Sequence, residues 1–316
     1  MDKKLVRRIR ENTSGRILLR EPLERHTTYR VGGAAELLAR PRDAEDAERL
    51  YRFLKRERVP VTVIGAGSNV IAPDEGIAGV VMCTAASSAR IVVLGGGRVR
   101  AEAGTSLLAL VRATAARGLT GLEPLAGIPG TLGGAVVMNA GTRDVEISEL
   151  LGRVSVCTSS GRKRALSARE CCFGYRRSVF SGTDWLVLGA ELILARGDAR
   201  RSRAMIDAFL SERRRKYHPE LPSAGSVFKR PPGAYAGRLI EEAGCKGMRV
   251  GDAVVADWHA NFILNVGSAT AKDIMALVTA VRNRVFERRG VWLELEQIVL
   301  PAEPIPGADA ACPRER

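Results

Sequence analysis

A glycine-rich run at residues 127–141 constrains this chain more than any other feature. The glycines of the run are Gly127, Gly130, Gly133, Gly134 and Gly141. Such a density favours neither core packing nor helix formation, because glycine has no side chain to bury and weakens a helix. Glycine does allow positive φ angles and lets main-chain N–H groups approach a bound anion closely. The run therefore predicts a loop that binds phosphate groups, such as the pyrophosphate of a cofactor.

A second glycine-rich turn follows a predicted buried strand at residues 61–64. It contains Gly65 and Gly67, but Val70 stands where a Rossmann fingerprint has its third glycine. The chain has no P-loop pattern, which disfavours a nucleotide hydrolase. Each glycine loop alone is equally well explained as a structural turn. The two together favour a ligand.

The charge of the chain has three explanations. A net charge of +14 suits nucleic-acid binding, binding of small anions or a solvated arginine-rich surface. The basic residues are spread along the sequence with one dense run at residues 213–216, and aromatic residues make up only 5%. No zinc-finger or base-stacking aromatic pattern occurs. We therefore expect no specific nucleic-acid partner.

The composition also bears on metals, membranes and location. The six cysteines and three histidines lack paired metal-ligand spacing, so we expect no metal. No apolar run approaches the ~20 residues that span a bilayer. The basic N-terminus is not followed by the apolar segment of a secretory signal. We expect a cytoplasmic protein without a membrane partner, and no obligate protein partner is evident.

Hydrophobic periodicity predicts a small α/β lobe followed by a second lobe. The elements of the first lobe are strands at residues 37–41, 61–64 and 80–82 and a helix beginning after Asp43. The elements of the second lobe are a hairpin at residues 91–103, a helix at 106–117 and strands at 154–157 and 185–194. A helix over residues 199–217 then leads to a third unit. In that unit Thr270 caps a helix that ends at Gly290, and a strand is predicted over residues 291–300.

Several segments, in this order, resemble one known family. These are residues 25–34, 65–69, 74–76, 121–123, 127–141, 175–178, 224–229, 259–262 and 293–296. They are similar to the UDP-N-acetylenolpyruvoylglucosamine reductases, the flavoenzymes of peptidoglycan precursor synthesis. The resemblance covers nearly the whole chain.

The resemblance implies an α/β (α+β) fold. A two-lobed FAD-binding module of the UDP-N-acetylmuramate dehydrogenase/vanillyl-alcohol-oxidase type is joined in it to a smaller α+β substrate-binding domain. The expected domains are residues 1–82 and 83–198 for the two FAD-binding lobes, residues 212–298 for the substrate, and a return of residues 299–316 to the first lobe. The short stretch between Ser178 and Trp185 resembles the family's shorter type, which lacks an added loop with a substrate-clamping tyrosine.

FAD and NADPH are the cofactors that the resemblance implies. NADPH would reduce FAD and leave before a UDP-sugar bearing an enolpyruvyl ether enters, so we expect ping-pong kinetics. The product would be UDP-N-acetylmuramate. The expected FAD-binding residues are Gly65, Ala66, Gly67, Ser68, Asn69, Gly127, Ile128, Pro129, Gly130, Thr131, Gly133, Gly134, Asn139, Ala140 and Gly141.

Reducing an enolpyruvyl ether requires a fixed cation and a proton donor. Hydride addition leaves negative charge on the α-carbon and the carboxylate, which a planar guanidinium can stabilise. By resemblance this cation is Arg176, although Arg176 and Arg177 alone also suit a surface loop. By resemblance Ser226 protonates the α-carbon, whereas its spacing alone suits an ordinary turn.

Glu296 is the third catalytic residue that the resemblance implies. Strand alternation places Glu294 and Glu296 on one face, which a solvated edge would also explain. The second glutamate of the motif is the catalytic one in the family, and burial would raise its pKa. For substrate binding the expected residues are Tyr175, Lys229 and Arg230.

The sequence departs from the family at three positions of the pocket. Arg230 replaces an asparagine, Ala256 a serine and Ala66 a glycine. Two other functions remain open from the residues alone. A sugar or lactone oxidase would share the glycine loops without needing all three catalytic residues, and a non-catalytic nucleic-acid binder would share the charge.

Overall fold

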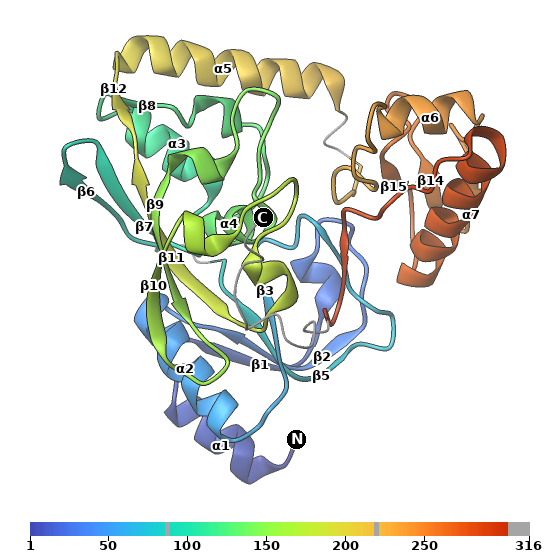
Figure 1. Cartoon of the computed structure of the whole chain (residues 1–316). Coiled ribbons are helices and arrows are strands. Elements are labelled where there is room, and N and C mark those ends of the chain that lie inside the picture. Colours follow the sequence, from blue (N-terminus) through green and yellow to red (C-terminus); the bar gives the residue numbers. More distant parts are fainter. Residues whose placement is uncertain (86–88, 218–220, 303–316) are drawn as a thin grey trace, which may run out of the picture.

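The computed structural model describes residues 1–85, 89–217 and 221–302 (Figure 1). Two lobes, each built on a sheet, lie against one another, and a smaller third part packs beside them. In Figure 1 the first lobe is blue at the bottom, the second is green at the upper left, and the third is orange at the right.

The first lobe contains a four-stranded sheet in the order β1-β2-β5-β3. Strands β2, β5 and β3 are parallel, and β1 is antiparallel to β2. Helix α2 connects β2 to β3, which confirms the predicted strand–helix–strand unit, and Asp43 caps its first turn. The bounds are β1 (Arg16–Pro22), β2 (Ala34–Arg40), α2 (Ala44–Arg56), β3 (Val61–Ile64) and β5 (Ile77–Cys83).

An N-terminal helix, α1 (Lys3–Glu11), was not predicted. Asp2 caps it by accepting a hydrogen bond from the backbone N–H of Leu5. Ile9 is fully buried in the first lobe, in the same cluster as Leu50 and Leu54 of α2. The signals for this helix in the sequence were the Asp2 cap and the apolar residues Leu5, Val6 and Ile9, which pack against the first lobe.

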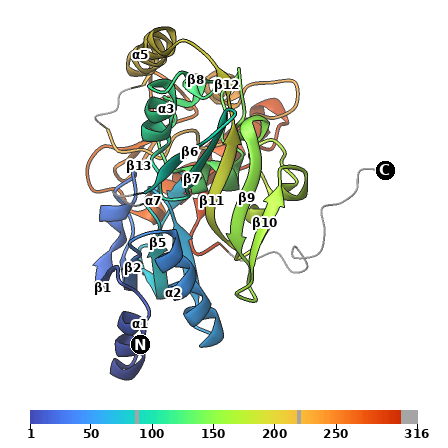
Figure 2. The same cartoon turned by 90° about the vertical axis from the view of Figure 1, so that its left-hand side faces the viewer.

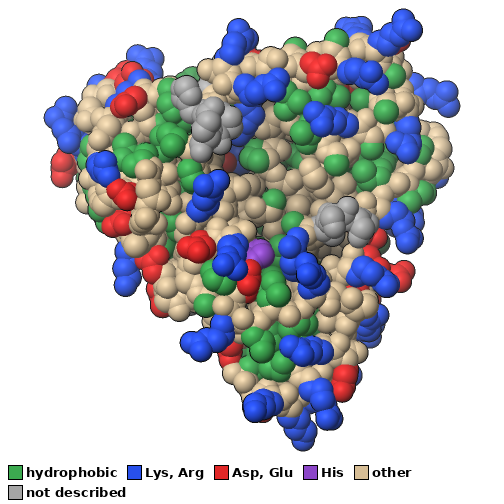
Figure 3. Space-filling model, turned by 180° about the vertical axis from the view of Figure 1, so that it is seen from behind, with side chains coloured by type: hydrophobic (Ala, Val, Ile, Leu, Met, Phe, Trp, Pro, Cys, Tyr) green, Lys and Arg blue, Asp and Glu red, His purple; other side chains and the backbone are tan. Residues whose placement is uncertain are grey.

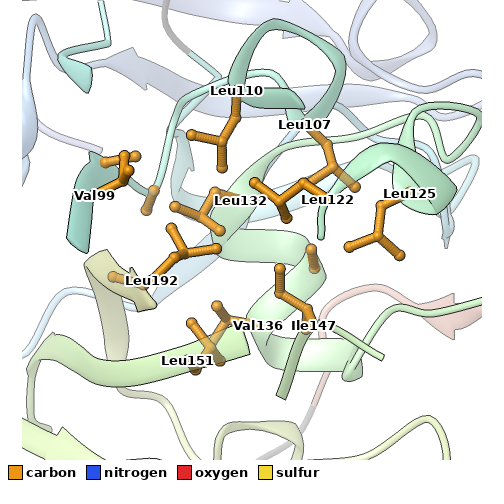
Figure 4. Packing of buried hydrophobic residues seen from close by; sticks show 14 of the residues in the cluster. Val99, Leu107, Leu110, Leu122, Leu125, Leu132, Val136, Ile147, Leu151 and Leu192 are labelled. Carbon is orange, nitrogen blue, oxygen red and sulfur yellow. The ribbon is translucent and has the colours of Figure 1, made fainter. Parts of the chain in front are cut away.

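The second lobe contains a five-stranded antiparallel sheet in the order β10-β9-β11-β7-β6 (Figure 2). The hairpin β6/β7 and the strands β9 and β11 confirm the predictions for this lobe. Helices α3 and α4 contribute leucines and valines to its core, including Leu107, Leu110 and Val136 (Figure 4). The bounds are β6 (Ile91–Gly95), β7 (Arg98–Glu102), α3 (Leu107–Ala115), α4 (Leu132–Met138), β9 (Leu151–Cys157), β10 (Lys163–Ser167) and β11 (Leu186–Ile193).

Helix α4 lies inside the glycine-rich run, where no helix was predicted. Thr131 caps its start, and Asn139 ends it in the left-handed conformation with φ 44°. A Cβ added to Gly133 would lie 2.9 Å from the Cβ of Ala103. Part of the glycine content therefore serves the close packing of a short helix against the end of β7.

Helix α5 (Ala199–Lys216) confirms the predicted connecting helix and runs along one side of the second lobe (Figure 1). It leads to the third part, which combines a three-stranded sheet with two helices. The bounds are α6 (Ala236–Glu242), β13 (Arg249–Val250), β14 (Ala253–Val255), β15 (Ile263–Asn265) and α7 (Ala271–Arg289). The capping box at Thr270 and the left-handed Gly290 begin and end α7 as predicted.

The third part shares its core with the first lobe. Tyr29, Val31 and Ile71 of the first lobe belong to the same buried cluster as the inward face of α7. The carboxylate of Asp74 also accepts hydrogen bonds from the backbone N–H groups of Ala271, at 2.7 Å, and Lys272, at 3.0 Å. The start of α7 is thus held by a residue of the first lobe.

The prediction of a strand over residues 291–300 is wrong for most of its length. Only β16 (Ile298–Val299) is regular, and it pairs in parallel with β4 (Val70–Ile71) of the first lobe. The preceding residues follow an irregular path that contacts residues 227–229, with one isolated bridge between Phe228 and Leu295. Of the segment 299–316 that was expected to return to the first lobe, residues 303–316 lie outside the described part.

Short elements complete the described chain. They are β8 (Leu119–Thr120), β12 (Ala195–Arg196), and the 3-10 helices η1 (Leu23–His26), η2 (Glu123–Leu125), η3 (Ile147–Leu150), η4 (Arg169–Cys171) and η5 (Val179–Gly182). None of the helices in the described residues has the length and hydropathy of a membrane span. Lysine and arginine side chains are scattered over the face shown in Figure 3 and do not gather in one stripe.

Candidate active site

The two glycine-rich loops meet in the structure. The hydroxyl of Ser68 donates a hydrogen bond to the carbonyl of Pro129 at 2.9 Å. A Cβ added to Gly65 would lie 2.5 Å from Oγ1 of Thr131, so the two backbones can approach only because residue 65 is glycine. Loops that are separated by about sixty residues in the sequence therefore form one surface.

Backbone N–H groups on the first of these loops are free to bind an anion. Within the described part of the chain, the N–H groups of Ala66, Gly67 and Ser68 donate to no protein acceptor. Gly67 is buried and has φ +68°, and an added Cβ would lie 2.0 Å from the carbonyl oxygen of His26. A buried N–H without an acceptor is costly. The loop therefore fits the diphosphate of a dinucleotide, whose oxygens would accept these hydrogen bonds.

The remaining residues predicted to bind FAD follow along the second loop. Gly127 to Thr131 precede α4, Gly133 and Gly134 lie within it, and Asn139 to Gly141 follow it. The side chain of Asn139 is buried and already bonded to protein. Its Nδ2 donates to a carboxylate oxygen of Glu146 at 2.8 Å and to the carbonyl of Gly174 at 3.1 Å. Asn139 thus positions the turn at Gly174, which is followed by Tyr175 and Arg176.

Arg176 is held in an uncommon conformation by three hydrogen bonds. Its φ of +52° is rare for a residue with a side chain. The guanidinium donates to the carbonyl of Asn139 at 3.3 Å and to the carbonyl of Gly141 at 2.8 Å. Its Nε donates to Glu296 at 3.1 Å. Positive charge is therefore fixed at the end of the glycine-rich run.

The structure brings two of the three predicted catalytic residues, Arg176 and Glu296, into direct contact. Both side chains are largely buried. Burial raises the pKa of the Glu296 carboxyl, and the neighbouring Arg176 guanidinium opposes this rise without cancelling it. Glu294, predicted to share a strand face with Glu296, is 72% exposed because the segment is not a regular strand. The two glutamates are thus in different environments.

Ser226 lies beside Glu296 through backbone contacts. Val227 accepts a hydrogen bond from the N–H of Glu296 at 2.8 Å, and Ser226 itself bridges to Phe262. The hydroxyl of Ser226 has no protein partner within the described residues. The three separate segments that carry the predicted catalytic residues therefore meet in the folded chain.

The residues predicted to bind substrate lie next to the contact between Arg176 and Glu296. The backbone N–H of Arg230 donates to the hydroxyl of Tyr175 at 3.3 Å. The Arg176 guanidinium lies 5.0 Å from the centre of the Tyr175 ring. Lys229 forms an ion pair with Glu294. These contacts place Tyr175 and Arg230 beside Arg176, and Lys229 beside Glu294, two residues before Glu296.

Sequence reasoning missed two polar residues that shape this centre. Gln297 is 4% exposed and donates to the carbonyls of Ala224 and Gly225. Tyr29 is fully buried and donates its hydroxyl proton to Gln297. Nothing near either residue in the sequence signals the contact, since 268 positions separate the two. The described residues also contain no group of histidine, cysteine or acidic side chains that could hold a metal ion.

Comparison with known proteins identifies the family. Residues 35–167 match the sequence model of an FAD binding domain, and residues 217–300 match that of the UDP-N-acetylenolpyruvoylglucosamine reductase C-terminal domain. The UDP-N-acetylenolpyruvoylglucosamine reductase of Moorella thermoacetica is 46% identical over 282 residues, which span 89% of this chain and 92% of that protein. The chain belongs to the UDP-N-acetylenolpyruvoylglucosamine reductase family.

Two further comparisons agree. The reductase of Carboxydothermus hydrogenoformans is 40% identical over 301 residues, covering 95% of this chain and 99% of that one. The crystal structure of UDP-N-acetylenolpyruvylglucosamine reductase from Thermus caldophilus superimposes with a TM-score of 0.75 and 38% identity, covering 91% of this chain and 99% of that chain. The predicted fold class, the FAD cofactor and the classification as an oxidoreductase are thereby confirmed.

Proposed function

We propose that the chain reduces the enolpyruvyl ether of UDP-N-acetylenolpyruvoylglucosamine to UDP-N-acetylmuramate, with NADPH as hydride donor, in peptidoglycan precursor synthesis. The contact between Arg176 and Glu296 carries this proposal. Arg176 is bonded to the end of the glycine-rich run, whereas Glu296 belongs to the matched C-terminal domain. The contact joins a cofactor-binding surface to a substrate-binding one.

The proposed division of labour follows the predicted domains. Residues 1–82 and 83–198 hold FAD between their glycine-rich loops, and residues 212–298 receive the sugar nucleotide. The free N–H groups of Ala66, Gly67 and Ser68 suit the FAD diphosphate. When bound, the flavin supplies hydride to the carbon β to the substrate carboxylate. The protein supplies charge and a proton.

Arg176 provides the fixed positive charge in this proposal. Its two hydrogen bonds to backbone carbonyls hold the guanidinium in place before substrate arrives, so little reorganisation accompanies the reaction. A guanidinium remains protonated at any physiological pH. Negative charge that develops on the substrate carboxylate is therefore stabilised from the first moment.

Ser226 and Glu296 complete the reaction. Ser226 gives its hydroxyl proton to the α-carbon, because the enolate-like intermediate is a stronger base than an ordinary substrate. Glu296, whose pKa is raised by burial, stabilises the intermediate or shares its proton. Tyr175, Lys229 and Arg230 bind the substrate beside this centre, and the cations among them suit its diphosphate.

Steady-state kinetics with FAD-loaded protein test the proposal. NADPH oxidation should depend on the enolpyruvyl sugar nucleotide, and mass spectrometry should find a product two hydrogens heavier than the substrate. Parallel lines in double-reciprocal plots are expected for a ping-pong reaction. Intersecting lines, or NADPH oxidation that ignores this substrate but responds to a simple sugar or lactone, would contradict the proposal.

A further inference from the structure

A buried amide lies directly behind the turn that carries Ser226. Gln297 is 4% exposed, and its Nε2 donates to the carbonyls of Ala224 at 3.2 Å and Gly225 at 3.4 Å. These are the two residues that precede Ser226. Gly225 has φ +75°, and no atom outside its chain neighbours lies within 4 Å of an added Cβ, so the turn itself is loosely packed there. Hydrogen bonds, rather than side-chain packing, therefore fix the turn at Gly225.

The orientation of this amide is fixed by its surroundings. Two carbonyl oxygens on one side require the NH₂ group to face them, since an amide oxygen there would repel both. On the other side the hydroxyl of Tyr29 donates to Oε1 at 3.1 Å. Tyr29 is fully buried, and burial raises the pKa of its phenol, so it remains a donor. All the polar groups of this contact are satisfied in only one arrangement.

The two residues after Ser226 are held by Asn261. The N–H of Val227 donates to the carbonyl of Asn261 at 2.9 Å, and the N–H of Phe228 donates to the Asn261 side chain, also at 2.9 Å. Gln297 thus holds the backbone before Ser226, and Asn261 holds it after Ser226. Its hydroxyl has no competing partner in the described residues.

We infer that Gln297 is a positioning residue for proton transfer, because it holds the 224–225 turn and so aims the Ser226 hydroxyl at the substrate. Tyr29 locks the Gln297 amide and thereby links the first lobe to this turn. The inference rests on the proposed function. In the step concerned, the α-carbon forms a C–H bond with the serine proton, the O–H electron pair stays on oxygen, and water restores the proton afterwards.

Measuring the two half-reactions separately distinguishes a misplaced Ser226 hydroxyl from a general loss of stability. Flavin reduction by NADPH does not involve Ser226, whereas reoxidation by the enolpyruvyl substrate does. Gln297→Met keeps the volume but removes every hydrogen bond of the amide. In anaerobic stopped-flow measurements on FAD-loaded protein, we expect this variant to be reduced at the native rate. Reoxidation should slow roughly 10- to 100-fold, as for a misplaced reacting group.

A double variant distinguishes the orientation of the Ser226 hydroxyl from the stability of the fold. Gln297→Met leaves the Tyr29 hydroxyl buried without an acceptor, and adding Tyr29→Phe removes that unsatisfied group. We expect the melting temperature to recover in the double variant while reoxidation stays slow. The solvent isotope effect on reoxidation should rise in both, because proton transfer becomes limiting.

Asn265→Ala is the matched control. Asn265 is buried at the same joint, and its side chain donates to the backbone carbonyl of Tyr29 at 3.0 Å. Within the described residues it forms no hydrogen bond with Ala224 or Gly225, and the bond of its backbone N–H to the carbonyl of Pro222 does not depend on the side chain. We expect it to lower stability and leave both half-reactions unchanged.

Three outcomes would overturn the inference: an unchanged reoxidation rate in Gln297→Met, an equal slowing of both half-reactions, or recovery of the rate in the double variant. Ser226→Ala keeps this failure distinct from failure of the proposed function. If Ser226→Ala slows reoxidation and Gln297→Met does not, only the inference fails. If Ser226→Ala has no effect either, the proposed role of Ser226 fails.

Discussion

At the scale of single residues, the centre combines costly features that packing alone does not require. Arg176 adopts a left-handed φ, and Glu296 is a buried carboxyl whose pKa is raised. Each costs free energy of folding, of the order of 1–3 kcal/mol for such a backbone conformation. Residues with such costs cluster at sites where function requires a fixed geometry. Replacing these residues with ones that avoid these costs should therefore stabilise the fold and lower the activity.

Replacement of Glu296 should show this gain in stability most clearly as the pH is raised. Because its pKa is raised in the folded chain, its contribution to stability is full below the ordinary value of 4.5 and is lost as pH rises through the raised pKa. Glu296→Gln cannot ionise, so its stability relative to the native chain should increase over that rise. Its kcat should fall about 100-fold or more. Chemical denaturation across a pH series, together with steady-state assays, measures both.

The neighbouring glutamate gives the control for that experiment. Glu294 is 72% exposed, so Glu294→Gln exchanges a solvated carboxylate and should change the free energy of unfolding by no more than about 0.5 kcal/mol. If Glu296→Gln is destabilised more at high pH than at low pH, the account of its burial is wrong.

Replacement of Arg176 tests whether a point charge suffices. Arg176→Lys keeps the charge but cannot reproduce the hydrogen bonds to Glu296, Asn139 and Gly141 together. We expect kcat to fall about 10²- to 10³-fold while the protein still binds FAD. Arg177→Lys, at the exposed adjacent arginine, is the matched control and should be nearly as active as the native enzyme. Equal activities of the two variants would mean that Arg176 is an ordinary loop residue.

At the scale of elements, local signals were sufficient where the cause of the structure is local. Asp43, Thr270 and Gly290 mark helix ends through caps that involve only the next few residues, and the structure confirms them. The path of residues 291–297 and the contact of Gln297 with Tyr29 depend on partners far away in the sequence. Single-sequence patterns hold no information on such partners, which is why the strand at 291–300 was predicted wrongly.

Local patterns and long-range contacts also contributed differently to predicting the site residues. Resemblance to the family selected Arg176, Ser226 and Glu296, and the structure brings their segments together. Periodicity alone would have left Glu294 and Glu296 equivalent, whereas only the folded chain separates an exposed carboxylate from a buried one.

The meeting of the glycine-rich loops can be tested at Gly65. An added methyl group would overlap Oγ1 of Thr131 at 2.5 Å and push the loops apart. An overlap of this kind costs about 1–3 kcal/mol. If the cost appears in cofactor binding, FAD affinity falls roughly ten- to a hundredfold. Fluorescence titration of the apoprotein with FAD measures the change for Gly65→Ala.

Gly96→Ala is the control for the loop experiment. Gly96 has a positive φ, +58°, whereas Gly65 does not, and it lies in the turn of the β6/β7 hairpin with nothing within 4 Å of an added Cβ. It should lose some stability through backbone strain and keep its FAD affinity. Equal FAD affinities of Gly65→Ala and the native chain would argue against a binding role for this junction.

At the scale of the whole molecule, the third part is fastened to the first lobe and meets the second at the reactive centre. Asp74, Tyr29 and β16 tie the first lobe to the C-terminal domain, while Arg176 reaches Glu296 from the second lobe. This arrangement encloses the centre between all three parts. None of them carries the proposed chemistry alone.

Asp74 provides a test of that fastening. Asp74→Ala removes two hydrogen bonds to the first turn of α7, and we expect the free energy of unfolding to fall by about 1–2 kcal/mol. Thr270→Ala removes a cap from the same helix within the third part and gives the size of a cap loss that leaves the joint intact. An unchanged denaturation midpoint for Asp74→Ala would show that the joint does not depend on this contact.

The central claim is that the three parts together reduce an enolpyruvyl sugar nucleotide. The most direct measurement mixes NADPH-reduced, FAD-loaded protein with UDP-N-acetylenolpyruvoylglucosamine under anaerobic conditions in a single turnover. The account predicts that the absorbance bands of oxidised flavin return as one equivalent of UDP-N-acetylmuramate forms. Flavin that stays reduced with this substrate, in protein that NADPH reduces normally, would contradict the claim.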